Sequence, residues 1–127
     1  MTIDAAVNAL SLAIAAAEGF PKKDSIPARA HNPGDLELGD QGLGTINRKT
    51  IYPDDAAGWR ALRHECTLIL TGRSHYIHTS MAITDVAMIY TGRDQASTWA
   101  TEVAHLLGLC ITDTLEDLLD LTDAPTK

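Results

Sequence analysis

The stretch from Phe20 to Asp55 constrains the fold more than any other feature, because proline and glycine interrupt it repeatedly. All but one of the prolines and several glycines fall there: Pro21, Pro27, Pro33, Pro53, Gly34, Gly39, Gly42 and Gly44. These residues argue against long regular elements, and a loop of this length in a compact domain is usually functional. Within it, Gly44–Ile46 and Thr50–Tyr52 are placed to pair as a short hairpin.

Helical periodicity covers most of the remaining chain. The first helix is expected from about Asp4 to Glu18, with Asp4 as its N-cap and Gly19 as its stop. Four more helices should follow. The second runs from Asp54 to Gly72, and the third is short, covering residues 83–90 and ending at Gly92. The fourth is capped by Asp94 and ends at Gly108, and the fifth begins with Asp113 and Glu116 as a capping-box-like pair. The sequence therefore predicts a mainly α protein.

The length of 127 residues suits one domain with a real core. We assign residues 1–122 to that domain and expect the tail, residues 123–127, to be loose. Hydrophobic residues make up 45% of the chain and aromatic residues only 5%, so the core must consist mostly of Ala, Leu, Ile and Val.

Charge and hydropathy exclude two classes of partner. The net charge of -7 argues against nucleic acid, because phosphate binding needs clustered Lys and Arg. No apolar run approaches the roughly eighteen residues of an integral membrane segment. The apolar stretch Ala5–Ala17 lacks a preceding basic region, so we expect a core helix and no signal peptide.

The cysteines and histidines show no spacing typical of a metal or redox site. Cys66 and Cys110 fall in predicted helices, where reduced and buried thiols are the ordinary case, although the sequence leaves a disulfide open. His75 and His78 have no Cys or acidic residue at zinc-ligand spacing beside them. We therefore expect no metal and no cofactor.

Glu18 is the strongest catalytic candidate in the chain. It continues the apolar stripe of Val7, Leu10 and Ile14, in steps that put all four side chains on one helix face. Partial burial and the negative end of the helix dipole both disfavour a charged carboxylate, so its pKa should be raised. A raised pKa suits a proton donor near neutrality. The alternative is a solvated glutamate on the last turn of the helix.

A series of motifs follows Glu18 in a recognisable order. Ala17–Phe20 reads Ala-Glu-Gly-Phe, and Pro27–Leu36 reads Pro-Ala-Arg-Ala-His-Asn-Pro-Gly-Asp-Leu; later come Ala57–Leu62, Tyr90-Thr91-Gly92 and Trp99–Ala104. Together these motifs resemble small phage-associated proteins of the lysozyme-like superfamily, which are peptidoglycan-cleaving muramidases or lytic transglycosylases. The resemblance runs from about Ala13 to Gly108. It implies that residues 1–122 are a lysozyme-like catalytic domain.

The resemblance implies a reaction and a set of site residues. Glu18 would be the general acid that cleaves the β-1,4 bond between N-acetylmuramic acid and N-acetylglucosamine. Asn32, Gly34, Asp35 and Tyr90 would bind the substrate, and peptidoglycan glycan strands would be the partner, with virion or lysis-cassette proteins as further partners. Such a protein reaches the cell wall by assisted export or as a component of a phage.

The second catalytic group stays open at this stage. Asp35, Glu37 and Asp94 are candidates, but the sequence places none of them at a diagnostic distance from Glu18. One pattern of phage lysozymes has Asp and Thr where this chain has Pro27 and Pro33, so its two-carboxylate mechanism does not carry over. Hydrolysis and formation of an anhydro-sugar therefore both remain.

Several of these residues also have purely structural interpretations. Asn32 can bond its own backbone in an Asx-Pro-Gly turn, and Arg29 is expected to pair with Asp35 and hold the loop. Tyr90 lies on an apolar stripe and suits the core as well as the substrate site. The same stripe pattern favours the core for Trp59 and Trp99.

Two other functions compete with a glycosidase. The acidic surface and the missing second carboxylate favour a catalytically inactive cell-wall-binding or virion structural module of the same fold. A small helical interaction domain, in which Pro27–Leu36 is only a turn, is the second alternative. Muropeptide release by the unmodified protein separates the glycosidase from the inactive module, and Glu18→Gln separates the glycosidase from the interaction domain, because it should abolish activity in the first and leave ligand binding unchanged in the second.

Overall fold

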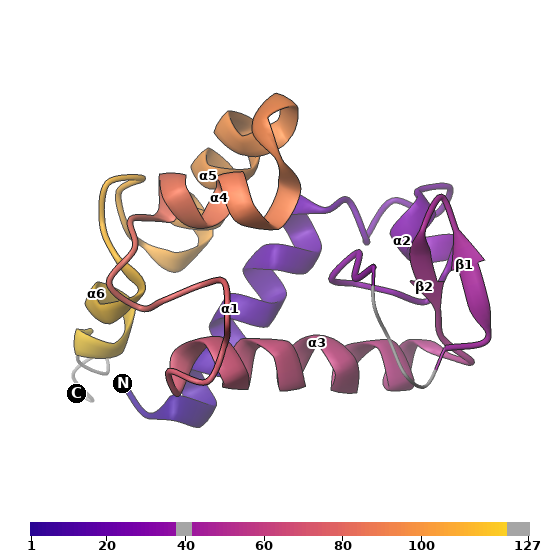
Figure 1. Cartoon of the computed structure of the whole chain (residues 1–127), viewed down its shortest axis with the longest axis horizontal. Helices are drawn as coiled ribbons and strands as arrows, with labels where there is room; N and C mark the ends of the chain where they lie inside the picture. The colour runs from indigo at the N-terminus through magenta and orange to yellow at the C-terminus, as the bar shows by residue number, and fades with distance from the viewer. Residues whose placement is uncertain (38–41, 122–127) are drawn as a thin grey trace, which may run out of the picture.

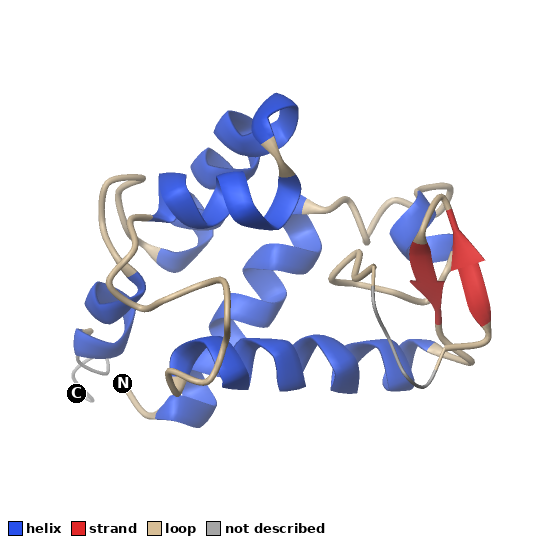
Figure 2. Ribbon diagram, viewed as in Figure 1, coloured by secondary structure: helices blue, strands red, loops and turns tan. Residues whose placement is uncertain are grey.

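The computed structural model describes residues 1–37 and 42–121. Within them the chain forms six helices and one two-stranded sheet: α1 Ile3–Ala17, α2 Ile26–Arg29, β1 Gly44–Ile46, β2 Lys49–Ile51, α3 Asp55–Leu70, α4 Ile83–Thr91, α5 Arg93–Leu107 and α6 Leu115–Asp120 (Figures 1 and 2). The predicted mainly α class is confirmed. The prediction of about five helices missed the short α2.

Helix α1 crosses the middle of the molecule and packs against both α3 and α5 (Figure 1). Its N-cap is Thr2, whose hydroxyl accepts a hydrogen bond from the Ala5 amide at 3.1 Å. The prediction of Asp4 as the cap was wrong, because the helix starts one residue earlier and Asp4 lies in its first turn. The helix ends at Ala17 with Glu18 as its C-cap, and Gly19 turns the chain away at a φ of +81°.

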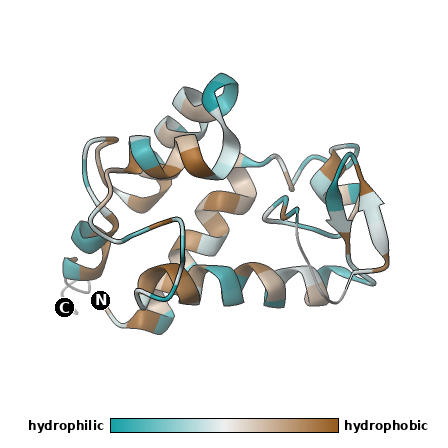
Figure 3. Cartoon of the chain, in the orientation of Figure 1, coloured by the Kyte–Doolittle hydropathy of each residue, from teal (hydrophilic) through white to brown (hydrophobic). Residues whose placement is uncertain are grey.

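The core lies where the apolar faces of α1, α3, α4, α5 and α6 meet, and apolar residues follow α1 along most of its length (Figure 3). Its largest fully buried apolar side chains are aliphatic: Leu10, Ile14, Leu62, Ile69, Ile83, Val103, Leu115 and Leu118. The aliphatic core predicted from the scarcity of aromatic residues is therefore confirmed. At one end of the molecule α4, α5 and α6 gather, and α2 and the hairpin lie at the other (Figure 1).

The predicted hairpin is confirmed, with one shift in its turn. Strands β1 and β2 are antiparallel, with Gly44 opposite Ile51 and Ile46 opposite Lys49. Asn47 and Arg48 form the turn with φ values of 47° and 67°, the backbone signs of a two-residue type I′ turn. Lys49 was predicted to be part of the turn but belongs to β2. This places its side chain on a strand beside the long loop.

The loop before the hairpin is fixed against α3 by close backbone packing. A Cβ atom on Gly58 would overlap the His31 carbonyl oxygen and lie 2.7 Å from Pro33 Cδ. Only glycine therefore lets the loop approach the helix this closely. The same region contains α2, capped by the Ser25 hydroxyl at 3.2 Å from the Ala28 amide. The prolines and glycines argue against long regular elements, and α2 is only four residues long; its Pro27 lies in the first turn, where the missing N–H costs nothing.

Other boundaries differ from the predictions by a residue or two. Helix α3 begins at Asp55, one residue after the predicted start, and Asp54 is its N-cap. Helix α5 follows Gly92 directly, so Asp94 lies in its first turn and does not cap it. Helix α6 has a capping box, but Thr114 and Asp117 form it instead of Asp113 and Glu116. The predicted loose tail, residues 123–127, lies outside the described residues.

Both cysteines are free, but their environments differ. Cys66 is buried in α3, and burial raises the pKa of its thiol to about 12. Cys110 is exposed in the loop after α5, so the prediction of a buried helical thiol was wrong there. Within residues 1–37 and 42–121, no helix has the length and apolarity that crossing a membrane requires.

Candidate active site

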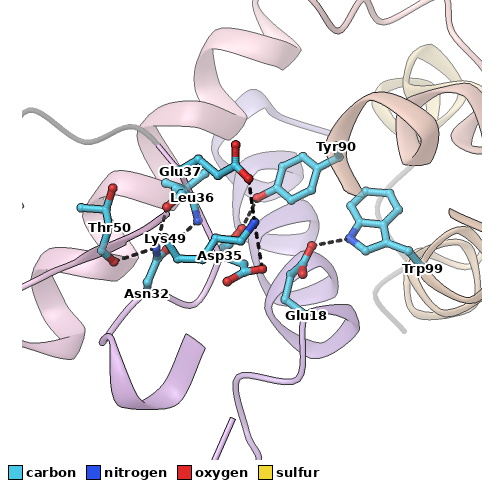
Figure 4. Close-up of polar contacts among 10 residues, drawn as sticks. Glu18, Asn32, Asp35, Leu36, Glu37, Lys49, Thr50, Tyr90 and Trp99 are labelled. Carbon is cyan, nitrogen blue, oxygen red and sulfur yellow. Dashed lines mark hydrogen bonds and ion pairs between the residues drawn. The ribbon is translucent and has the colours of Figure 1, made fainter. Parts of the chain in front are cut away.

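Glu18 lies where four other segments converge on the end of α1 (Figure 4). Its backbone amide is bonded to the Ile14 carbonyl at 2.9 Å, which fixes the side chain at the last turn of the helix. The indole Nε1 of Trp99, on α5, donates a hydrogen bond to Glu18 Oε2 at 2.9 Å. The carboxyl group is therefore partly buried and oriented by the neighbouring helix.

The surroundings of Glu18 favour its protonated form. They raise the pKa of this carboxyl from 4.5 to about 7. Burial is the largest cause, followed by the negative charge of Asp35; the Trp99 hydrogen bond and the positive charge of Lys49 act in the opposite direction. At neutral pH the group is thus divided between its two forms, which suits a group that must both hold and release a proton.

Asp35 is the second carboxylate of the site. It sits in the long loop with a φ of +53°, and Lys49 Nζ, on β2, lies 3.3 Å from its Oδ2. Its Oδ1 is buried and accepts no hydrogen bond from any N–H or hydroxyl in the described residues.

Lys49 is the positive group of the site. Besides Asp35 it contacts Glu37 Oε1 at 3.2 Å. Burial disfavours its ammonium form, but the two carboxylates outweigh this and raise the pKa of Lys49 above its usual value. Two acidic groups of the loop are thereby joined to β2 through one cation.

Asn32 holds the loop together and is fully buried. Its Nδ2 donates to the carbonyls of Leu36 and Thr50, both at 2.9 Å, and its Oδ1 accepts from the Leu36 amide at 2.9 Å. Three of the four hydrogen bonds that an asparagine amide can make are therefore used inside the protein. The loop-holding interpretation of this residue matches these bonds more closely than direct contact with a sugar.

Gly34 and Tyr90 join the loop to α4. The Tyr90 hydroxyl donates to the Gly34 carbonyl at 2.6 Å, and its ring stacks on Trp99 with centroids 5.1 Å apart. Burial raises the pKa of Tyr90 well above its usual value, so the phenol stays protonated. A Cβ atom on Gly34 would lie 2.6 Å from Leu62 Cδ1, so no side chain fits there.

The remaining predicted residues take different places. Glu37 is exposed beside Lys49, and Asp94 is exposed on the first turn of α5. The predicted pair of Arg29 with Asp35 is replaced by the Lys49 pair. Trp59 is half-buried and packs edge-on against Phe20, with centroids 5.5 Å apart. Within the residues that the structure describes, no group of His, Cys, Asp and Glu is arranged to hold a metal ion.

Two residues of the site, Lys49 and Trp99, were not predicted to belong to it. The core prediction for Trp99 is confirmed for its ring, which is only 3% exposed, but the indole N–H points to Glu18. A buried indole needs an acceptor, and this requirement was the available signal. Lys49 carried no such signal, because its position depends on the type of the hairpin turn.

Comparisons with known proteins add no assignment. No family model matches the chain, and neither the curated proteins nor the solved structures contain a match.

Proposed function

We propose that this chain cleaves the glycan strands of peptidoglycan, as a muramidase or lytic transglycosylase, with Glu18 as the general acid. The observation that carries the proposal is the Glu18 carboxyl group, which is oriented by Trp99 and has its pKa raised to about 7. Glycoside cleavage needs a carboxylic acid that is still protonated near neutral pH. The lysozyme-like motif order supplies the substrate class.

The hydrogen bond from Trp99 determines which oxygen of Glu18 delivers the proton. Because the indole N–H occupies Oε2 at 2.9 Å, the acidic proton belongs on Oε1. Protonation of the bridging oxygen then breaks its bond to the anomeric carbon and leaves positive charge on that sugar. The Glu18 carboxylate that remains is stabilised by Trp99 and by the positive charge of Lys49, which both favour its ionised form.

Asp35 has two successive roles in this proposal. Before the substrate binds, the negative charge of Asp35 favours the protonated form of Glu18. During cleavage the Asp35 carboxylate stabilises the developing positive charge electrostatically.

The acceptor of the cleaved sugar decides between the two enzyme classes. Attack by water gives a reducing sugar end, whereas attack by the sugar's own 6-hydroxyl gives an anhydro end. Asp35 would assist the first reaction as a base, and the second needs only one essential carboxyl group. The products distinguish the two, because the anhydro product is lighter by one water molecule.

The test is to incubate purified protein with peptidoglycan and to identify released muropeptides by mass spectrometry. We expect release by the unmodified protein, no release by Glu18→Gln, and normal release by Glu102→Gln, a matched change on the exposed face of α5. Near-ultraviolet circular dichroism shows whether each variant is folded. If the unmodified protein releases nothing but still sediments with the cell wall, the catalytically inactive binding module is correct instead.

A further inference from the structure

Lys49 is placed asymmetrically with respect to the two carboxyl groups of the site. Its Nζ lies 3.3 Å from Asp35 Oδ2 and 3.2 Å from Glu37 Oε1 (Figure 4). Within the described residues, the ion pairs of Lys49 do not include Glu18. Trp99 contacts that other carboxyl group, because its indole N–H donates to Glu18 Oε2 at 2.9 Å.

The backbone fixes Lys49 on the side of the loop. The Thr50 amide donates to the Leu36 carbonyl at 2.8 Å. Thr50 follows Lys49 on β2, and Leu36 lies between the two acidic residues of the loop, so this hydrogen bond brings the ammonium to both. The side chains of Lys49 and Asp35 are 25% and 18% exposed, whereas that of Glu37 is 52% exposed. The pair with Asp35 is therefore the less screened of the two.

This asymmetry decides which carboxyl group holds a proton. Two carboxyl groups whose charges interact can share a single proton at intermediate pH, as Glu18 and Asp35 do here. A cation stabilises the nearest carboxylate most, because the Coulomb energy falls with distance. The Lys49 ammonium therefore favours the ionised form of Asp35 over that of Glu18. Burial, the largest cause of the raised pKa of Glu18, acts in the same direction.

The titratable groups on the neighbouring helices do not compete for this proton. Burial raises the pKa of Cys66, on α3, to about 12 and that of Tyr90, on α4, well above its usual value. Both therefore stay neutral between about pH 4 and pH 8. The charge of Glu65, also on α3, acts on Tyr90, whereas the charges that shift the pKa of Glu18 come from the loop and β2.

We propose that Lys49 is a positioning residue that keeps Asp35 ionised and thereby assigns the single proton of the site to Glu18. This inference rests on the proposed function, because a general acid must carry its proton when the glycan binds. An ion pair that only stabilised the hairpin would leave the location of the proton unchanged. The location of the proton is therefore the quantity to measure.

Carbon-13 nuclear magnetic resonance measures the ionisation of each carboxyl group, because the chemical shift of a carboxyl carbon changes when its proton is lost. Glu18→Gln and Asp35→Asn assign the two signals by their disappearance. At about pH 5, which is two units below the Glu18 pKa of about 7, the unmodified protein should have Glu18 protonated and Asp35 ionised. A proton on Asp35 with Glu18 ionised would overturn the proposal without any further variant.

Three substitutions then test the role of Lys49, with near-ultraviolet circular dichroism as the check on folding. Lys49→Met should increase the ratio of protonated to ionised Asp35 at the same pH about tenfold or more, and Lys49→Arg should restore the original ratio. Arg48→Met removes a neighbouring exposed cation that is not paired with Asp35 or Glu37, and it should change nothing. An unchanged ratio in Lys49→Met, no recovery in Lys49→Arg or an equal change in Arg48→Met would each contradict the proposal.

Activity gives a second readout and separates this proposal from the proposed function. In the muropeptide assay, Lys49→Met should move the acidic limb of the pH–activity profile to higher pH by about one unit. The alkaline limb should move less, because Nζ contacts Asp35 and acts on Glu18 only through its charge. An unmoved acidic limb would also refute the role of Lys49. If the unmodified protein releases no muropeptides, the proposed function fails, and the carboxyl signals still decide the role of Lys49.

Discussion

Replacement of Glu18 by Gln tests the physical basis of the site through the pH dependence of stability. The folded protein raises the pKa of this carboxyl to about 7, compared with 4.5 without the surrounding structure. Between these two pH values the folded state binds more protons than the unfolded state. Stability must therefore fall as the pH rises through this window, and the Glu18 contribution becomes constant above about pH 7.

The size of the effect follows from the same two pKa values. Their difference corresponds to a penalty on the order of 3 kcal/mol when Glu18 is ionised in the folded state. Glutamine has the shape of the protonated acid, and its carbonyl can accept the Trp99 hydrogen bond. Glu18→Gln should therefore unfold like the unmodified protein near pH 4 and be more stable by on the order of 3 kcal/mol near pH 8.

The assay is chemical denaturation of both proteins at several pH values between about 4 and 8. The difference in the free energy of unfolding should grow with pH up to neutrality and then level off. Glu102→Gln, on the exposed face of α5, serves as the control and should show no such growth. A constant difference between Glu18→Gln and the unmodified protein across this range would refute the claim that Glu18 is held in its protonated form.

Three further substitutions test the contacts around the site. Trp99→Phe keeps an aromatic ring at this position but removes the hydrogen bond that lowers the pKa of Glu18. The alkaline limb of the pH–activity profile should therefore move up by about one pH unit. An unmoved limb would contradict this role of Trp99. Asn32→Ala leaves buried backbone groups without partners. It should lower the free energy of unfolding, measured with urea, by on the order of 3 kcal/mol. A decrease under about 1 kcal/mol would contradict the loop-holding role of Asn32. Gly58→Ala should lower the melting temperature despite the higher helix propensity of alanine, because the new Cβ overlaps the His31 carbonyl; a raised melting temperature would mean that the loop yields easily.

The sequence predicted the helices well because each one carries an apolar stripe and most end at a glycine. Gly19, Gly72, Gly92 and Gly108 all have positive φ values next to helix ends, where residues with side chains are strained. The caps were harder to predict, because several polar residues lie near each helix start and the packing of the helix selects among them. In α6, for example, the N-cap is Thr114 and not the neighbouring Asp113.

The site was only partly predictable, for two different physical reasons. Glu18 stands out because a carboxylate on an apolar stripe is visible in one helix alone. Asp35 and Lys49 meet only after the loop and the hairpin have folded, and the pairing depends on a two-residue turn at Asn47 and Arg48. A three-residue turn would have left Lys49 off the strand, so no local pattern could have assigned it.

The Asn-Pro-Gly-Asp segment illustrates how a polar motif can serve a site without touching its substrate. The side-chain amide of Asn32 forms its hydrogen bonds with the backbone of the loop and the hairpin, and the Gly34 carbonyl accepts a hydrogen bond from Tyr90. Asp35 is then the member of the segment with a buried oxygen, Oδ1, that accepts no hydrogen bond from any of the described residues. Asn32, Pro33 and Gly34 therefore act by holding Asp35 in a left-handed conformation that a free aspartate seldom adopts. It follows that changes at Asn32 or Gly34 should weaken the coupling between the two carboxyl groups and lower the pKa of Glu18 toward its usual value, even though neither residue contacts Glu18.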